Sequence, residues 1–380
     1  MSSGTTELST DAARRLRLRS QGLVSPDGGL GSPKASPAEV VRRMVALQGQ
    51  DLPAVLRAIA IRSRPATTLD DVRAEFDAGR LVRGWTQRGT LFATTPGDLA
   101  ALVSLTGERM IRTGRRTRET EGLDDAVMAR AEAVAREALA ASGTGITRAT
   151  MIDRWQAAGV PVEGQRGYHL IASLALRRVL HWGPFAGAQQ LMVATPGPED
   201  GGATPENPDA ALRRVALSYF ASRGPATTDD LAWWLGLPKR PVRAAVAALR
   251  EEEPDALVEV EVDGKAMLVG RKAGHGPDGS TSPGRGFGLA DPSGVVLVPG
   301  FDEMILGYQD RELVADAEAM RTVVPFTNGI FRPAILLDGR LVGTWRRVPK
   351  AGEAPFELVP GVGRQARAAV DAAVSAWHLG

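Results

Sequence analysis

The chain has 380 residues, too many for one ordinary hydrophobic core, and this length predicts two or more packed units. Cysteine is absent and the four histidines are dispersed, which argues against disulfides and conventional metal centres, so we expect neither metal nor cofactor. Lys+Arg number 46 against 44 Asp+Glu, so any attraction to nucleic acid must come from charge placement. No apolar run suggests a signal peptide or membrane span, and we expect a cytoplasmic protein.

The first third of the chain predicts three helices and a hairpin. Apolar spacing places the helices at residues 10–19, 37–48 and 69–78. Extended segments follow at residues 81–86 and 90–93. Five arginines come next in a short polar stretch, and they fit either phosphate contact or a solvated helix face. They are Arg109, Arg112, Arg115, Arg116 and Arg118.

The second of these helices has an unusual end. Ser36 begins it as the N-cap of a capping box, and its apolar stripe continues onto Gln48, where the pattern calls for a core residue. In a regular helix Gln50 would point about 200° away from Gln48, so both can face one cavity only if the chain unwinds at Gly49. Pro53 then disfavours further helix. The alternative is a buried amide that satisfies loop backbone groups.

The same order of elements recurs in the middle of the chain. A helix is expected at residues 125–141, a second helix is capped by Thr147, and a third covers residues 165–180. Residues 179–182 and 190–194 then form a hairpin. One side of the third helix is apolar, which leaves the other side for a partner. That polar side carries Arg166, His169 and Arg177.

A third copy follows. A helix at residues 209–223 precedes a helix that Thr227 caps and Gly236 ends. A basic helix at residues 239–249 comes next, and then a hairpin around Asp263-Gly264, the pair that a type I′ turn requires. The basic helix presents Lys239, Arg240, Arg243 and Arg250.

Three helices and a hairpin, three times over, is the element order of a winged helix, whose third helix fits the major groove of DNA. The alternative is that some copies only scaffold the others. From residue 277 the chain becomes β-like, and a helix at 365–377 closes it. We therefore predict a mainly α protein with β (α+β) in four parts. They are winged-helix units at residues 1–120, 121–200 and 201–276, and a β-rich module at residues 277–380.

Short motifs resemble the AlkZ-like winged-helix DNA glycosylases. Leu47-Gln48-Gly49-Gln50 resembles the Gln-x-Gln motif of that family, in which both glutamines belong to the active site. The family commonly has histidine where this chain has Phe92, so a role for that side chain does not carry over. The other matches are Arg83 to Thr86 with Arg88-Gly89-Thr90-Leu91, Pro299-Gly300-Phe301-Asp302-Glu303 with Gly307-Tyr308 and Asp310-Arg311, Asn328-Gly329-Ile330 with Arg332-Pro333, and Asp338-Gly339-Arg340 through Arg346.

The resemblance implies three tandem winged helices and a C-terminal β-barrel-like module. It implies a monofunctional DNA glycosylase that hydrolyses the N-glycosidic bond of alkylated purines, such as bulky N7-alkylguanine or N3-alkyladenine adducts and crosslinks. The partner is double-stranded DNA bearing these lesions, and the role is repair or self-resistance to a DNA-alkylating natural product. We expect a monomer with no contact to membranes.

Two amides can catalyse this hydrolysis only if the leaving group is good, because glutamine is a poor general base. An N7-alkylated purine already carries positive charge and departs as a neutral molecule, so Gln50 needs only to orient a water while Gln48 helps hold it. Asp302 and Glu303 are the competing candidates, as a general base or as a hydrogen-bonded structural element. Lys34 is the lysine nearest the motif, which disfavours a Schiff-base mechanism.

Two other functions compete with the enzyme. One is a non-catalytic winged-helix transcription regulator, which has no reason to keep two amides in an inward-facing stripe. The other is a protein that sequesters the alkylating drug in an interhelical pocket. On any DNA-binding interpretation the contact candidates are Arg83, Arg88, Thr90, Arg112, Arg115, Arg116, Arg166, His169, Arg177, Lys239, Arg240, Arg243, Thr327, Asn328 and Arg332, with Thr327 and Asn328 assigned to the minor groove.

Overall fold

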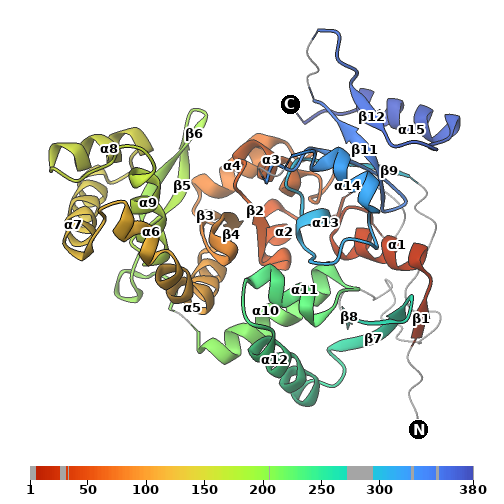
Figure 1. The fold of residues 1–380 in the computed structure, drawn as a ribbon, viewed down its shortest axis with the longest axis horizontal. Helices are drawn as coiled ribbons and strands as arrows, with labels where there is room; N and C mark the ends of the chain where they lie inside the picture. Colours follow the sequence, from red (N-terminus) through yellow and green to blue (C-terminus); the bar gives the residue numbers. More distant parts are fainter. Residues whose placement is uncertain are drawn as a thin grey trace. The chain divides into compact units, whose positions relative to one another are not determined.

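The structure is a computed structural model, and it describes residues 6–25, 31–32, 34–204, 206–271, 294–326, 329–347 and 351–379. The chain forms two compact units, one of Met1–Val72 with Leu212–Gly380 and one of Arg73–Ala211 (Figure 1). Helices outnumber strands in the described residues, as the α+β prediction requires. The four-part division of the sequence stays a prediction.

The helices of the first unit follow the predicted order, and three further helices, α3, α13 and α14, were not predicted. The chain passes between the two units within α4 and within α10. The helices of the first unit are α1 (Thr10–Ser20), α2 (Pro37–Met44), α3 (Leu52–Ala60), α4 (Leu69–Asp77), α10 (Pro208–Arg223), α11 (Thr228–Leu235), α12 (Lys239–Glu252), α13 (Glu303–Leu306), α14 (Ala317–Val323) and α15 (Arg364–Ser375).

A three-stranded sheet in this unit joins the start of the chain to the third predicted hairpin. Strand β1 (Thr6–Leu8) runs parallel to β7 (Leu257–Val262), which pairs antiparallel with β8 (Lys265–Gly270). Asp263 and Gly264 between β7 and β8 have φ angles of 49° and 74°, which fits the predicted type I′ turn. Apolar residues of β1 and α1 pack on this hairpin in one core cluster.

The C-terminal module differs from the predicted barrel. Its described strands form an open sheet in the order β12 (Phe356–Leu358), β11 (Arg340–Trp345), β10 (Ala334–Leu337) and β9 (Val295–Val298). Side chains alternate along β10, so Leu336 packs with residues of α13 and α14, whereas Ile335 packs with residues of α15. Both faces of the sheet are apolar and covered by helices, so the sheet forms the middle layer of this module. Its described strands do not close into a barrel.

The second unit contains the other hairpins. Its strands follow the order β4 (Leu91–Thr94), β3 (Val82–Trp85), β5 (Leu180–Ala186) and β6 (Gln189–Ala194). Thr147 caps α8 as predicted, and Trp155 of that helix packs in the core with Met151 and Leu170. The helices are α5 (Pro96–Thr113), α6 (Arg115–Thr120), α7 (Asp125–Ser142), α8 (Arg148–Ala157) and α9 (Arg166–Leu176).

The expectation that Pro53 disfavours helix is wrong. Helix α3 begins at Leu52, and Asp51 is its N-cap, with a side chain that accepts a hydrogen bond from the Ala54 amide at 2.9 Å. Proline is tolerated there because the first turn of a helix has no intrahelical acceptor for its N–H groups. Helix α5, which was not predicted, likewise has a proline, Pro96, in its first turn.

His181 on β5 makes the stability of the protein depend on pH. Burial lowers the pKa of His181 to about 4, below the value of about 6.5 of an unfolded histidine. As the pH falls, the histidine is therefore protonated in the unfolded state before it is protonated in the folded state. The free energy of unfolding is unaffected by His181 above about pH 6.5, and it decreases as the pH falls from about 6.5 toward about 4. The full effect is about 3 kcal/mol.

Urea unfolding at several pH values checks this expectation. The His181→Gln variant should lose less free energy of unfolding than the wild type between about pH 7 and about pH 5. Equal losses in the two proteins would show that His181 does not carry the dependence.

Candidate active site around the glutamine motif

The glutamine motif lies on a short non-helical segment. Helix α2 ends at Met44, Val45 has a φ of 64°, and β2 (Ala46–Gln48) follows directly. The chain therefore leaves the helix at Val45 and not at Gly49, where we expected it to unwind. A positive φ is costly for a β-branched residue, so the surrounding structure must enforce this break.

The exposure of the two glutamines differs. Gln48 is 6% exposed, whereas Gln50 is an exposed residue between β2 and the start of α3. Because α2 ends at Met44, the 200° separation that a regular helix would impose does not apply. Strand β2 ends at Gln48, so Gln50 lies outside the strand as well.

Arg223 at the end of α10 holds the break at Val45. Its guanidinium donates to the carbonyl oxygen of Met44 at 2.9 Å and to that of Ala46 at 2.8 Å. Both acceptors flank Val45, and the Arg223 side chain is fully buried. One charged donor therefore satisfies the last carbonyl group of α2 and the first carbonyl group of β2.

Glu303 at the start of α13 binds the motif itself. Its Oε1 accepts the backbone N–H of Gln48 at 2.9 Å. Its Oε2 accepts from Arg223 Nη2 at 2.8 Å and from the indole of Trp234 at 3.0 Å. Figure 1 shows α13 beside β2, in agreement with these contacts. The Glu303 carboxylate therefore positions Gln48 and compensates the buried charge of Arg223.

Asp302 has a different set of partners. It is the N-cap of α13, and its Oδ1 accepts the amide of Met304 at 2.9 Å. Both carboxylate oxygens also accept from Arg62, at 2.7 and 2.8 Å, and Arg62 donates further to Gln21. Asp302 and Glu303 are both buried and paired with guanidinium groups, which favours the structural alternative over a general base.

Burial shifts the pKa values of two titratable groups near the motif, Arg43 and Tyr308. Burial lowers the pKa of Arg43 to about 10, with the charges of Arg62 and Arg223 as lesser causes, so Arg43 stays charged. Burial raises the pKa of Tyr308, whose hydroxyl donates to the Arg223 carbonyl oxygen at 2.8 Å. Neither Arg43 nor Tyr308 therefore changes its charge near neutral pH.

The first DNA-contact candidates lie around β3 and the turn after it. Arg83 on β3 is 9% exposed, and its guanidinium lies 5.7 Å from the Trp182 ring, so little of it is open to a phosphate. Arg88 and Thr90 are half-buried, and Arg88 lies 5.6 Å from the ring of Phe92. Phe92 itself is fully buried.

The arginine cluster is helical. Arg112, Arg115 and Arg116 are exposed at the end of α5 and on α6, and Arg115 pairs with Glu119. Arg118 turns back and donates to the Ile111 carbonyl oxygen at 2.8 Å. Arg109 on α5 is exposed as well, so four of the five arginines form a solvated basic surface, and phosphate contact by it stays a prediction.

The candidates on α9 are held by neighbouring residues. Arg166 donates to the Glu121 carbonyl oxygen at 2.7 Å, and Arg177 lies 3.7 Å from a Glu132 carboxylate. His169 is half-buried. This helix presents charge to solvent, as predicted, but acidic neighbours offset part of that charge.

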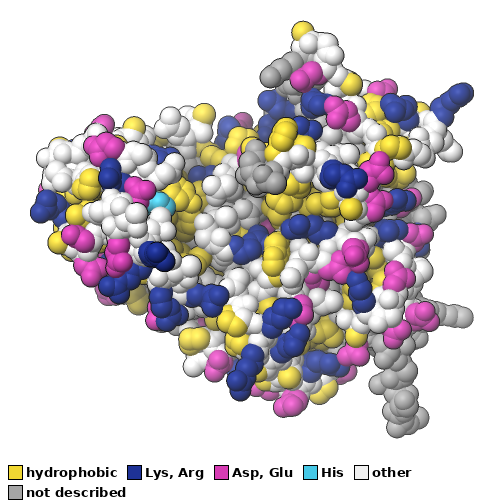
Figure 2. Space-filling view, in the orientation of Figure 1, with side chains coloured by type: hydrophobic (Ala, Val, Ile, Leu, Met, Phe, Trp, Pro, Cys, Tyr) yellow, Lys and Arg dark blue, Asp and Glu magenta, His cyan; other side chains and the backbone are white. Residues whose placement is uncertain are grey.

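Lys and Arg side chains gather over α12 in Figure 2. Lys239, Arg240 and Arg243 are exposed, and Asp229 pairs with Lys239 at 2.9 Å and with Arg243 at 2.8 Å. Arg332 is half-buried. Thr327 and Asn328 lie outside the described residues.

Sequence reasoning did not single out the residues that hold the motif. Arg223 and Trp234 are far from Gln48 in the chain, and Arg62 and Gln21 reach the site through Asp302. Their local sequence patterns give no sign of a shared site. Among the described residues no group of His, Asp and Glu side chains could hold a metal ion. Nor is any helix in the described ranges long and apolar enough to span a membrane.

The profile of one protein family, described as DNA glycosylase AlkZ-like, matches residues 41–378. The chain therefore belongs to the AlkZ-like DNA glycosylase family and is an enzyme of that class. This confirms the resemblance found in the motifs.

Two comparisons with proteins of Streptomyces sahachiroi agree with this family assignment. The chain is 28% identical over 327 residues to its interstrand DNA cross-link repair glycosylase, and the match covers 82% of each protein. The solved structure of its DNA glycosylase AlkZ matches with a TM-score of 0.74 and 22% identity, covering 97% of this chain and 95% of the other. The structural match shows a shared fold.

Proposed function

We propose that the chain is a monofunctional DNA glycosylase that hydrolyses the N-glycosidic bond of alkylated purines in double-stranded DNA. The substrates are bulky N7-alkylguanine and N3-alkyladenine adducts, including interstrand crosslinks such as those in the name of the Streptomyces relative. The observation that carries the proposal is the glutamine segment, whose backbone is fixed by Glu303 and Arg223. The role is repair or self-resistance to a DNA-alkylating natural product.

The chemistry follows from the charge of the lesion. The electron pair of the C1′–N9 bond leaves with the cationic base, which becomes neutral, and no proton donor is needed. Water adds to the oxocarbenium-like sugar at C1′ and releases its proton to solvent. The amide oxygen of Gln50 orients that water, and the amide dipole of Gln48 faces the developing positive charge.

The buried ion pairs support this division of roles. Glu303 forms a buried ion pair with Arg223, and Asp302 forms one with Arg62. Glu303 therefore acts as a positioning residue that fixes the backbone of the motif, and Asp302 caps the helix that carries Glu303. The neutral amides of Gln48 and Gln50 are then the groups that contact the substrate.

Release of free base from duplex DNA containing N7-methylguanine tests the proposal. We expect free 7-methylguanine and an intact strand with an abasic site, because a monofunctional enzyme does not cleave the backbone. A sequence-selective footprint on undamaged DNA without base release would instead indicate the regulator.

We further propose that the repeated helices and hairpins are winged-helix units in a monomeric enzyme. Helices α7, α8 and α9 lead into β5–β6, and α10, α11 and α12 lead into β7–β8, which is the element order of that fold. Helix α12 is then the DNA-contacting helix of its unit, and its exposed basic side chains support this role.

Replacement of Arg240 by glutamine should weaken duplex binding to a similar degree for all sequences. If Arg240 contacts one phosphate, the slope of log affinity against log salt should fall by about one. Arg136 on α7 is a matched control, because it is exposed, pairs with Glu132 and lies outside the proposed interface. Fluorescence anisotropy at several salt concentrations measures both variants, and equal slopes for the two would contradict the assignment.

A further inference from the structure

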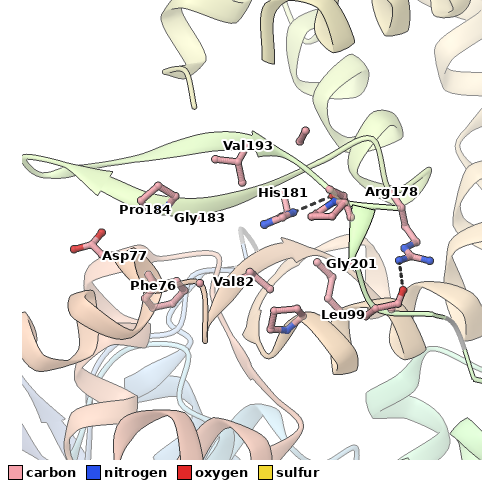
Figure 3. A pocket seen from close by; sticks show the side chains of 18 residues that line it. Phe76, Asp77, Val82, Leu99, Arg178, His181, Gly183, Pro184, Val193 and Gly201 are labelled. Atoms are coloured by element: carbon pink, nitrogen blue, oxygen red, sulfur yellow. Dashed lines mark hydrogen bonds between the residues drawn. The ribbon is translucent and has the colours of Figure 1, made fainter. Parts of the chain in front are cut away.

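A pocket in the second unit lies apart from the glutamine motif in the chain. Its volume is about 340 Å³, which is at the lower end of the range for small-molecule sites. Figure 3 shows it between the hairpin β5–β6 and the helical segments that carry Phe76 and Leu99. The size is suited to one ring or two fused rings, not to a polymer.

His181 supplies a directed polar group at this pocket. It is 9% exposed, and Figure 3 shows its ring among the lining side chains. Its Nδ1 lies 2.9 Å from the Thr195 hydroxyl. Burial lowers the pKa of His181 to about 4, so the ring is neutral near pH 7 and each nitrogen can make one hydrogen bond. Within the described part of the chain, Nε2 has no hydrogen-bond partner.

The rest of the lining is mostly apolar. Phe76, Val82, Leu99 and Val193 form walls that favour apolar surface over hydrated charge.

The two charged residues of the lining already have partners. Arg178 donates to the Ala203 carbonyl oxygen at 2.8 Å, and Asp77 accepts the Phe185 amide at 2.7 Å. They hold the loop and the hairpin that border the pocket, so the uncharged imidazole is left as the polar group for a ligand.

We propose that this pocket binds an uncharged heteroaromatic molecule of one or two fused rings through its apolar walls and one hydrogen bond to Nε2 of His181. An excised purine base and an unrelated heteroaromatic metabolite share this chemistry. The site does not depend on the glutamine motif, and its binding can be measured without DNA.

Calorimetric titration of the full chain with 7-methylguanine and with quinoline tests the proposal. We expect at least one probe to bind with a dissociation constant below about 1 mM, and a change in the Nε2 chemical shift of His181 on binding. His181→Leu removes the hydrogen bond and Val193→Trp fills the cavity, and each should weaken binding by about tenfold or more. His378→Leu, at an exposed residue near the C-terminal end and outside the pocket lining, is the matched control and should bind as the wild type does.

The two probes distinguish the two possible ligands, an excised purine base and an unrelated heteroaromatic metabolite. Binding of 7-methylguanine alone supports an excised base as the ligand, and binding of quinoline, alone or with the base, supports the broader heteroaromatic class. Failure of both probes to bind the wild type would overturn the proposal. Binding that neither pocket variant changes would overturn it as well.

Discussion

Replacement of Gln50 by alanine is expected to lower the single-turnover rate of base release by about 100- to 1000-fold, the usual loss when one preorganised polar group is removed from an active site. Gln50 is exposed, so its replacement should change the free energy of unfolding by less than about 0.5 kcal/mol. Duplex binding should also be retained. The measurement is quenched-flow analysis of base release from N7-methylguanine DNA.

Gln156→Ala provides the control for this experiment, because Gln156 is an exposed glutamine on α8. It should release base at the wild-type rate. Turnover that persists in the double variant Gln48→Ala/Gln50→Ala would show that the active site has been assigned to the wrong residues.

The second large effect is expected at the buried ion pair. Arg223→Met leaves Glu303 without its charged partner, and breaking a buried pair in this way costs about 3–5 kcal/mol. The double variant Arg223→Met/Glu303→Leu should recover part of that stability, because it leaves no uncompensated charge but still removes the partners of the Met44 and Ala46 carbonyl groups and of the Trp234 indole. It should not recover base release, since the Gln48 amide and the carbonyl groups beside Val45 lose their partners.

Chemical denaturation and single-turnover kinetics measure the two effects separately. Lys265→Met is the control, because it removes the partly exposed pair with Asp310 and should cost less than about 1 kcal/mol. If the double variant regained full activity together with stability, the ion pair would only stabilise the fold and would not position the motif.

Local chemistry allowed much of the fold to be predicted. The caps at Ser36, Thr147 and Thr227 all form, because each depends on hydrogen bonds within four residues. The turn at Asp263-Gly264 likewise follows from residues that accept positive φ. Such features need no information from distant parts of the chain.

The geometry of the site could not be predicted in this way. The helical stripe of α2 gave no reason to end at Val45, and the break depends on Arg223, which is far away in the sequence. Glu303 contacts the Gln48 amide across 255 residues. The motif identified the glutamines, but only the folded chain shows what holds their backbone.

The barrel expected at the C-terminal end shows a different limit. Alternating apolar residues predicted strands there correctly, yet such a pattern does not say whether a sheet closes. Ile335 and Leu336 are both buried because helices cover both faces of the sheet. A sheet that closes into a barrel and an open sheet that helices cover on both faces can bury the same residues. The sequence alone therefore could not distinguish these two arrangements.

The central claim is that neutral amides suffice because the damaged base is already charged. The most direct test compares single-turnover release of cationic N7-methylguanine with release of uncharged hypoxanthine from the same duplex position. The account predicts that hypoxanthine is released at least about 1000-fold more slowly, a difference of about 4 kcal/mol in activation free energy. Comparable rates for the two bases would show that a proton donor takes part, and the role assigned to the glutamines would then be wrong.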